Sequence, residues 1–216
     1  MDTKNVMQTR ALQTHGDLAQ KASLSTPVVA DEIALATATA EWGYQEDERG
    51  RDMLVLHLRD TLGAEAQAQF SPAELENEQH LRARLQGLLL AAVQVRAWRK
   101  ALRQLYDEVG QWCQQRSPPA IVQEDSIELN EERSGPYQVP MLRIMAEGRA
   151  ADLEPIAGWV VGADGRVDLR GAGGREVLIL EENEADKWSW VSDRATARLQ
   201  ELTNDLFLQL LDGVLQ

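Results

Sequence analysis

One amphipathic pattern restricts the fold of this chain more than any other feature. Between residues 81 and 113, apolar residues recur at alternating spacings of four and three, and a second row follows at spacings of seven. The first row is Leu81, Leu85, Leu88, Ala92, Val95, Arg99, Leu102, Tyr106, Val109 and Cys113. The second row is Ala91, Trp98, Leu105 and Trp112. The two rows predict a long helix whose apolar face is wider than a two-stranded seam, as expected when a helix packs among several elements.

Local signals set the limits of this helix. Ser71-Pro72-Ala73-Glu74 is a capping box with proline at the first helical position, and Ser117-Pro118-Pro119 is the next strong breaker. Two shorter helices are predicted before it, over residues 27–42 and 47–62. The first follows a threonine cap and a proline, and each ends at a glycine.

After residue 119 the apolar pattern changes from a helical period to a period of two. Strands are predicted over residues 121–129, 137–145, 159–161, 166–169 and 176–182, with a short strand around Trp188 and Trp190. Pro140 restricts its strand to a sheet edge or a bulge, and residues 162–165 predict a hairpin turn. A helix from about residue 192 closes the chain. The predicted class is α+β, with an N-terminal helical region, an antiparallel β-meander and a C-terminal helix.

The domain organisation follows from the same signals. Residues 1–25 are interpreted as a polar, weakly ordered tail, residues 26–117 as a helical region, and residues 120–216 as the β-meander with its helix. A single continuous domain is the alternative.

The charge balance argues against some classes of partner. The chain has 22 basic and 35 acidic residues, a formal net charge of −13. Residues 1–118 hold 13 basic and 16 acidic side chains, and residues 119–216 hold 9 and 19, so the second half carries most of the excess. Proteins that bind phosphate backbones usually have a basic excess, so this balance argues against a nucleic-acid partner.

No apolar run is long enough for a membrane span, since the longest, residues 88–93, is far shorter than the roughly 20 residues required. The N-terminus shows no apolar signal region, and a single cysteine excludes an internal disulfide. A cytoplasmic protein is therefore expected.

The sequence shows no pattern for a metal or a cofactor. His15, His57 and His80 are scattered, and none is at ligand spacing from another histidine or from Cys113. Cys113 continues the apolar helix row, which favours a buried small side chain over a nucleophile. We expect no metal and no cofactor.

A cationic stripe crosses the long helix. Arg96, Arg99, Lys100 and Arg103 are spaced to share one face. Two interpretations stay open: internal ion pairs with acidic segments, or a docking face for an anion or an acidic partner.

Tryptophan is frequent, with six residues. Trp98 and Trp112 lie on one flank of the helix, and Trp188 and Trp190 lie on one face of a strand. Each pair fits either the core or a partner surface, because tryptophan is common in both.

One acidic pattern suggests catalysis. Asp168 on one strand and Glu181 at the end of the next resemble the metal-binding carboxylates of restriction-endonuclease-like nucleases. The resemblance covers about twenty residues, and Asn183 stands where that family places a lysine. It implies Mg²⁺ ligation by Asp168 and Glu181. The competing interpretation is a solvated strand edge.

Three functions are therefore open. The favoured one is a non-enzymatic interaction protein or accessory subunit of a larger intracellular complex, with a protein partner or self-association. The second is an acidic inhibitor or immunity-type protein that covers a basic target. The third is the metal-dependent nuclease. Whether the chain is an enzyme stays open, and the absence of a catalytic motif favours a non-enzyme.

Overall fold

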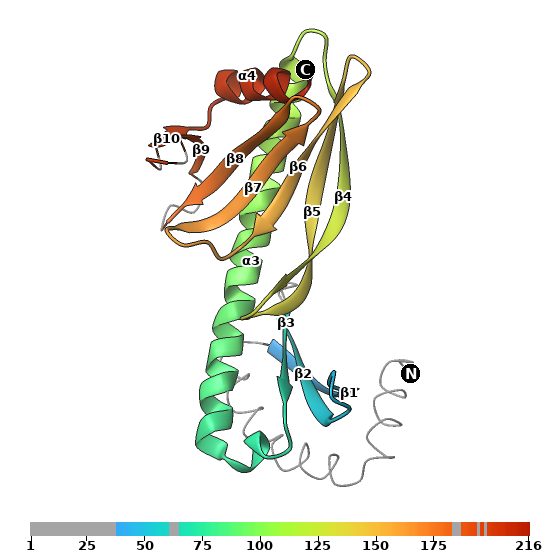
Figure 1. Ribbon diagram of the computed structural model, residues 1–216, viewed down its shortest axis with the longest axis vertical. Coiled ribbons are helices and arrows are strands. Elements are labelled where there is room, and N and C mark those ends of the chain that lie inside the picture. The colour runs from blue at the N-terminus through green and yellow to red at the C-terminus, as the bar shows by residue number, and fades with distance from the viewer. Residues whose placement is uncertain (1–37, 61–64, 183–186, 194, 197) are drawn as a thin grey trace. The chain divides into compact units, whose positions relative to one another are not determined.

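The computed structural model describes residues 38–60, 65–182, 187–193, 195–196 and 198–216. It is an α+β fold in which a long helix is followed by a seven-stranded antiparallel meander and a C-terminal helix (Figure 1). This confirms the predicted fold class. The predicted tail of residues 1–25 lies outside the described residues.

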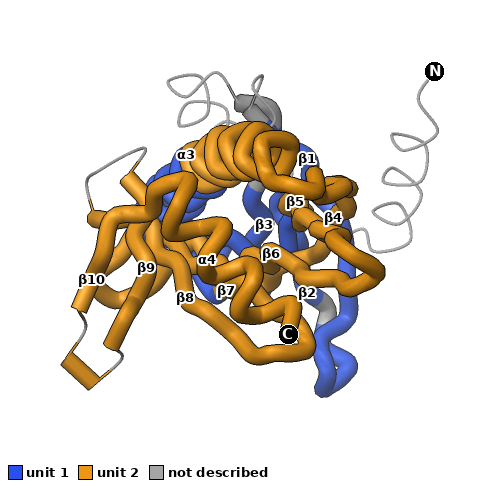
Figure 2. The backbone as a smooth tube through the Cα atoms, turned by 90° about the horizontal axis from the view of Figure 1, so that it is seen from above, with its two compact units in different colours: residues 1–96, 132–137 blue, residues 97–131, 138–216 orange. Residues whose placement is uncertain are grey.

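The chain divides into two compact units (Figure 2). One contains residues 1–96 and 132–137, and the other contains residues 97–131 and 138–216. The domain boundaries expected from the sequence stay a prediction.

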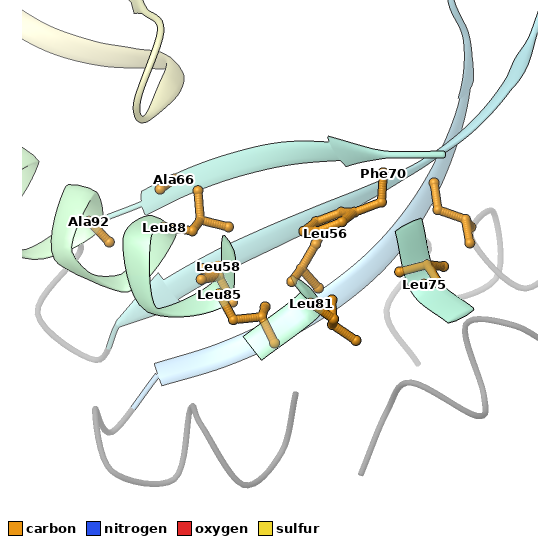
Figure 3. Packing of buried hydrophobic residues seen from close by; sticks show 10 residues of the cluster. Leu56, Leu58, Ala66, Phe70, Leu75, Leu81, Leu85, Leu88 and Ala92 are labelled. Atoms are coloured by element: carbon orange, nitrogen blue, oxygen red, sulfur yellow. The ribbon is translucent and has the colours of Figure 1, made fainter. Parts of the chain in front are cut away.

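The first unit is built on a three-stranded sheet of order β1-β2-β3. Its elements are β1 (Ala38–Glu46), β2 (Asp52–Asp60), β3 (Glu65–Phe70), the 3-10 turn η1 (Glu74–Glu76) and the first part of α3 (Glu78–Gln115). Leucines of β2 and α3 pack together with Phe70 and Leu75 in one apolar cluster (Figure 3). This burial holds the helix against the sheet.

Two predicted helices are wrong where the structure describes them. Residues 38–42 lie in β1 and residues 52–60 form β2, whereas residues 27–37 lie outside the described residues. The apolar run around Leu54 and Leu58 also fits a period of two, and a run this short does not distinguish a strand from a helix. The turn is made at Gly50, whose φ is 70°, and the Asp47 carboxylate accepts hydrogen bonds from the Arg49 and Arg51 amides.

The long helix is confirmed with a later start. The Glu74 carboxylate does reach back to Ser71, where it accepts hydrogen bonds from both the amide and the hydroxyl. This contact organises η1, and the side chain of Asn77 accepts from the His80 amide at the start of α3. Every member of the predicted apolar row is buried except Arg99.

The second unit contains the seven-stranded sheet, in the order β10-β9-β8-β7-β6-β5-β4. Its strands are β4 (Ile121–Glu131), β5 (Gly135–Ala146), β6 (Arg149–Ala157), β7 (Ala163–Gly171), β8 (Gly174–Glu181), β9 (Trp188–Asp193) and β10 (Arg198–Glu201). Burial along β5 changes phase between Val139 and Leu142, on either side of Pro140, and pairing with β6 begins only at Leu142. β5 lies between β4 and β6 rather than at a sheet edge, and the alternative of a bulge at Pro140 stays a prediction.

Three features of this sheet differ from the prediction. β6 was not expected, because its inward residues include small Ala151 and a proline, which give a weak alternating pattern. Residues 159–161 form no strand, although an isolated bridge joins Val160 to Ala163. β7 begins at Ala163, so the turn lies at residues 161–162, earlier than the predicted turn at residues 162–165. The final helix is α4 (Asn204–Val214), capped by Thr203, and the upstream residues that were predicted to be helical include β10.

Candidate interaction surfaces

Two of the predicted interface tryptophans are buried in the second unit. Trp98 of α3 and Trp188 of β9 have ring centroids 5.9 Å apart. A Cβ atom on Gly165 of β7 would overlap the Trp98 ring, so the strand passes directly under the indole. These residues form the inner face of the sheet rather than an exposed surface.

The other two tryptophans are half-buried. Trp112 packs against Phe207 of α4 with ring centroids 5.4 Å apart. The Trp190 indole nitrogen donates to the Glu176 carboxylate at 2.7 Å. Their use by a partner stays a prediction.

The four residues of the cationic stripe on α3 differ in their exposure to solvent. The Arg99 guanidinium donates to the Gln138 carbonyl at 2.8 Å, and Arg96 is half-buried. Lys100 and Arg103 are exposed, and neither forms a hydrogen bond or an ion pair with another described residue. Of the four stripe residues, only Lys100 and Arg103 are exposed enough to fit the docking interpretation.

Asp168 is surrounded by arginine. Its side chain is 0% exposed, and it accepts two hydrogen bonds from Arg166, at 2.8 and 3.1 Å. Arg170 donates to the same carboxylate at 3.2 Å, and Arg175 of β8 lies 3.4 Å away. Bidentate arginine–carboxylate contacts of this kind are charge-assisted hydrogen bonds and are stronger than neutral ones. Both carboxylate oxygens of Asp168 therefore already accept hydrogen bonds from arginine guanidinium groups.

Glu181 lies elsewhere on the same face. Register pairs Asp168 with Val177 of β8, four residues before Glu181, which corresponds to roughly 13 Å along a strand. Glu181 accepts hydrogen bonds from Ser189 at 2.6 Å and from Lys187 at 3.0 Å, and these contacts lower its pKa. The structure does not bring Asp168 and Glu181 together as joint metal ligands, and Asn183 lies outside the described residues.

A wider charged network surrounds Asp168, and the sequence interpretation missed it. Directly paired residues place Arg143 of β5, Asp152 of β6, Arg170 and Arg175 in one row across four strands. Arg143 and Asp152 form a bidentate pair, and Arg170 also contacts Glu154 of β6 at 2.8 Å. The signal was present in the alternation of Arg166, Asp168 and Arg170, which a strand places on one face.

The outer side of α3 in the first unit is apolar at two exposed positions. Leu90 is 72% exposed and Val93 is 47% exposed, and their spacing of three places them on one helix face. Ala83 and Gly87 are exposed on the same face. The sequence interpretation also missed this surface, because it considered only the two apolar rows of the helix that face the core.

Other reactive groups are protected or solvated. Cys113 is buried, and burial raises its pKa to about 11, so the thiol stays protonated at neutral pH. Burial also raises the pKa of Tyr106, whose hydroxyl lies within hydrogen-bond distance of the carbonyls of Pro140 and Leu153. His57 lies in β2, His80 is exposed, and His15 lies outside the described residues.

No three histidine, cysteine, aspartate or glutamate side chains of the described chain form a group that could hold a metal ion. No helix in the described part is both long and apolar enough to cross a membrane. No protein-family model, no curated protein and no solved structure matches this chain.

Proposed function

We propose that this chain is a non-enzymatic interaction protein, an accessory subunit that binds another protein through α3. The observation that carries the proposal is the exposed pair Leu90 and Val93. Exposed apolar side chains that adjoin one another on a helix are typical of partner surfaces, since burying each one releases about 1.5–3 kcal/mol of hydrophobic free energy.

The helix backbone around this pair supports the same proposal. Gly87 lies inside α3, where glycine costs about 1 kcal/mol relative to alanine. A Cβ atom at this position would have no described residue within 4 Å, so packing within the described part of the chain does not explain the glycine. A small residue on an exposed helix face allows another backbone to approach closely. Cytoplasmic location and self-association belong to this proposal as its expected setting and its simplest partner.

The test is a double variant, Leu90→Glu with Val93→Glu. We expect the wild-type chain to elute from a host extract in an assembly larger than its own 24.1 kDa, and the variant to elute alone. Purified protein analysed by light scattering identifies self-association. Val161→Glu is the matched control, because Val161 is fully exposed in a loop of the second unit.

Two results would contradict the proposal. One is a wild-type chain that is monomeric both when purified and in the extract. The other is a double variant that assembles as the wild type does.

An acidic inhibitor is the second candidate, and β4 favours it. This edge strand exposes Glu124, Asp125 and Glu128, which suit a basic target. The candidates differ in which substitutions matter. In an inhibitor, Glu124→Gln with Glu128→Gln slows association with the partner isolated from the extract, and the Leu90 and Val93 substitutions leave it unchanged.

A further inference from the structure

β4 is an edge strand that is open to solvent on both of its faces. It is 11 residues long, and among the described strands only β5 pairs with it (Figure 1). Four consecutive residues, 123–126, are exposed. Successive side chains of a strand point to opposite faces, so neither face of β4 is covered along this stretch. Long open edges are uncommon, because their unpaired amides and carbonyls accept further strands.

The free side of β4 presents the backbone groups of every second residue. The Ser126 amide donates to the carboxylate of its neighbour Asp125 at 2.8 Å. The Gln138 side chain of β5 contacts those of Ser126 and Glu128, while its carbonyl accepts a hydrogen bond from α3. Ser126 therefore lies at a position where the two strands do not exchange backbone hydrogen bonds. Such positions alternate along a strand, so the backbone groups of Glu124 and Glu128 also point to the free side.

The same strand carries negative charge without a partner. β4 contains four acidic residues and no basic residue. Glu124, Asp125 and Glu128 are exposed, and none of them forms an ion pair with a described residue. Arg143 of β5 is close enough to Asp125 for their charges to interact, but its guanidinium is already paired with Asp152. The open edge therefore combines unpaired backbone groups with uncompensated carboxylates.

We propose that the free edge of β4 binds an extended, basic segment of a partner protein as an additional strand. In this mode the backbone hydrogen bonds hold the segment and the side chains select it. Glu124 and Glu128 lie on one face, four residues apart, and Asp125 lies on the other. An added strand has the same repeat, so a segment with basic residues at matching positions meets all three. The inference rests on the proposed interaction function and adds a contact separate from Leu90 and Val93.

Other occupants fit this edge less well. A second copy of the chain, paired antiparallel along β4, would bring acidic residues opposite acidic residues, which is unfavourable. A nucleic acid would be repelled by the same carboxylates. No three metal-ligating side chains of the described residues form a group for a metal ion, so a divalent cation has no site here. Charges on an edge also serve to prevent strand pairing, and the experiment separates that role from binding.

The test is a fluorescence anisotropy titration of the full chain with a labelled peptide of about ten residues. Its repeat is lysine-lysine-threonine-valine, which matches the three carboxylates in either strand direction. The control peptide is N-methylated at threonine and valine, so it keeps the charge and loses the amides needed for pairing. Glu124→Lys is the main variant. Glu201→Lys is the matched control, because Glu201 is exposed on β10, the short strand at the opposite edge.

We expect wild-type binding that weakens as salt is added and that the N-methylated peptide does not reproduce. Affinity should fall about three- to tenfold in Glu124→Lys, since one attractive contact becomes repulsive. Glu201→Lys should stay within about twofold of the wild type.

Amide hydrogen exchange measured by NMR reads out the added strand directly. The Glu124 and Glu128 amides point to the free side, so their exchange should slow about tenfold at a peptide concentration about ten times Kd. The Gln123 and Ile127 amides point toward β5 and should show no such change.

Three outcomes would overturn the inference: equal binding of the N-methylated peptide, equal losses in the two variants, or no binding at low salt. The last result would assign the acidic residues to the prevention of strand pairing alone. Absent peptide binding, with an assembly that the Leu90 and Val93 double variant still loses, refutes this inference and leaves the helix surface standing. Peptide binding without any such assembly refutes the helix surface alone.

Discussion

The two faces of the β7–β8 hairpin come from alternate residues of the same strands, yet their surroundings are opposite. Val167 and Leu169 point inward with Leu178, and all three are buried. Arg166 and Arg170 point outward and form ion pairs that water still reaches. The inner face gains its free energy from apolar burial, and the outer face gains little from ion pairs in water. The contrast indicates that the inner face supplies most of the folding free energy of this hairpin.

The largest expected effect comes from emptying the inner face. Trp98→Ala should lower the free energy of unfolding by about 3–5 kcal/mol, because it leaves a cavity between Gly165 and Trp188. Urea denaturation followed by circular dichroism measures this loss. Trp190→Ala is the control with the same change of side chain at a half-buried position, and its loss should be smaller. A larger loss in the control would show that the inner face is not the main source of stability.

The next effect concerns Asp168, whose side chain on the outer face is fully buried. Asp168→Asn should lower the free energy of unfolding by about 2–3 kcal/mol, less than for a fully buried ion pair because the arginines are partly solvated. The same denaturation experiment applies. Glu154→Gln, at a carboxylate that is 32% exposed, should cost less than about 1 kcal/mol. Equal losses at the two positions would contradict a special structural role for Asp168.

A smaller effect of opposite sign is expected on the exposed side of α3. Gly87→Ala should raise the free energy of unfolding by about 0.5–1 kcal/mol, because alanine favours the helix and the added methyl group meets none of the residues that the structure describes. Thermal melting detects the change. Destabilisation would mean that the glycine serves packing inside the protein, and the argument for a partner at this face would fail.

The smallest effect depends on pH. Contacts from Ser189 and Lys187 lower the folded pKa of Glu181 below its ordinary value of 4.5, so the stabilisation is complete above pH 4.5 and is lost as pH falls through the lowered pKa. Glu181→Gln removes this dependence. Its unfolding free energy should therefore fall less steeply than that of the wild type between neutral pH and about pH 3, as measured by urea titrations at each pH. Identical slopes would contradict the shift.

The long helix and most of the sheet could be predicted, because their patterns are long or strongly apolar. Leu81 and Val109 belong to one row of α3 that no other period explains, and Leu178 lies in an uninterrupted apolar run of β8. The N-terminal strands could not be predicted, since the run at Leu54 is short and fits two periods. β6 was missed because its inward side chains are small.

The candidate surfaces were harder to predict than the fold. Asp168 was identified from the sequence, but as a metal ligand, because the three arginines that contact it come from two strands whose register was unknown. Leu90 was missed because the neighbouring Leu88 and Leu89 conceal it in a continuous apolar run, and only the helix shows that it faces away from the core.

The most direct test of the contrast between the two faces is a paired measurement on Trp98→Ala and Arg143→Gln. Both variants would be unfolded in urea under the same conditions as the wild type. The contrast predicts that the free energy of unfolding falls by about 3–5 kcal/mol in Trp98→Ala, while it falls by less than about 1 kcal/mol in Arg143→Gln, whose ion pair with Asp152 is open to water. Equal losses in the two variants would contradict it.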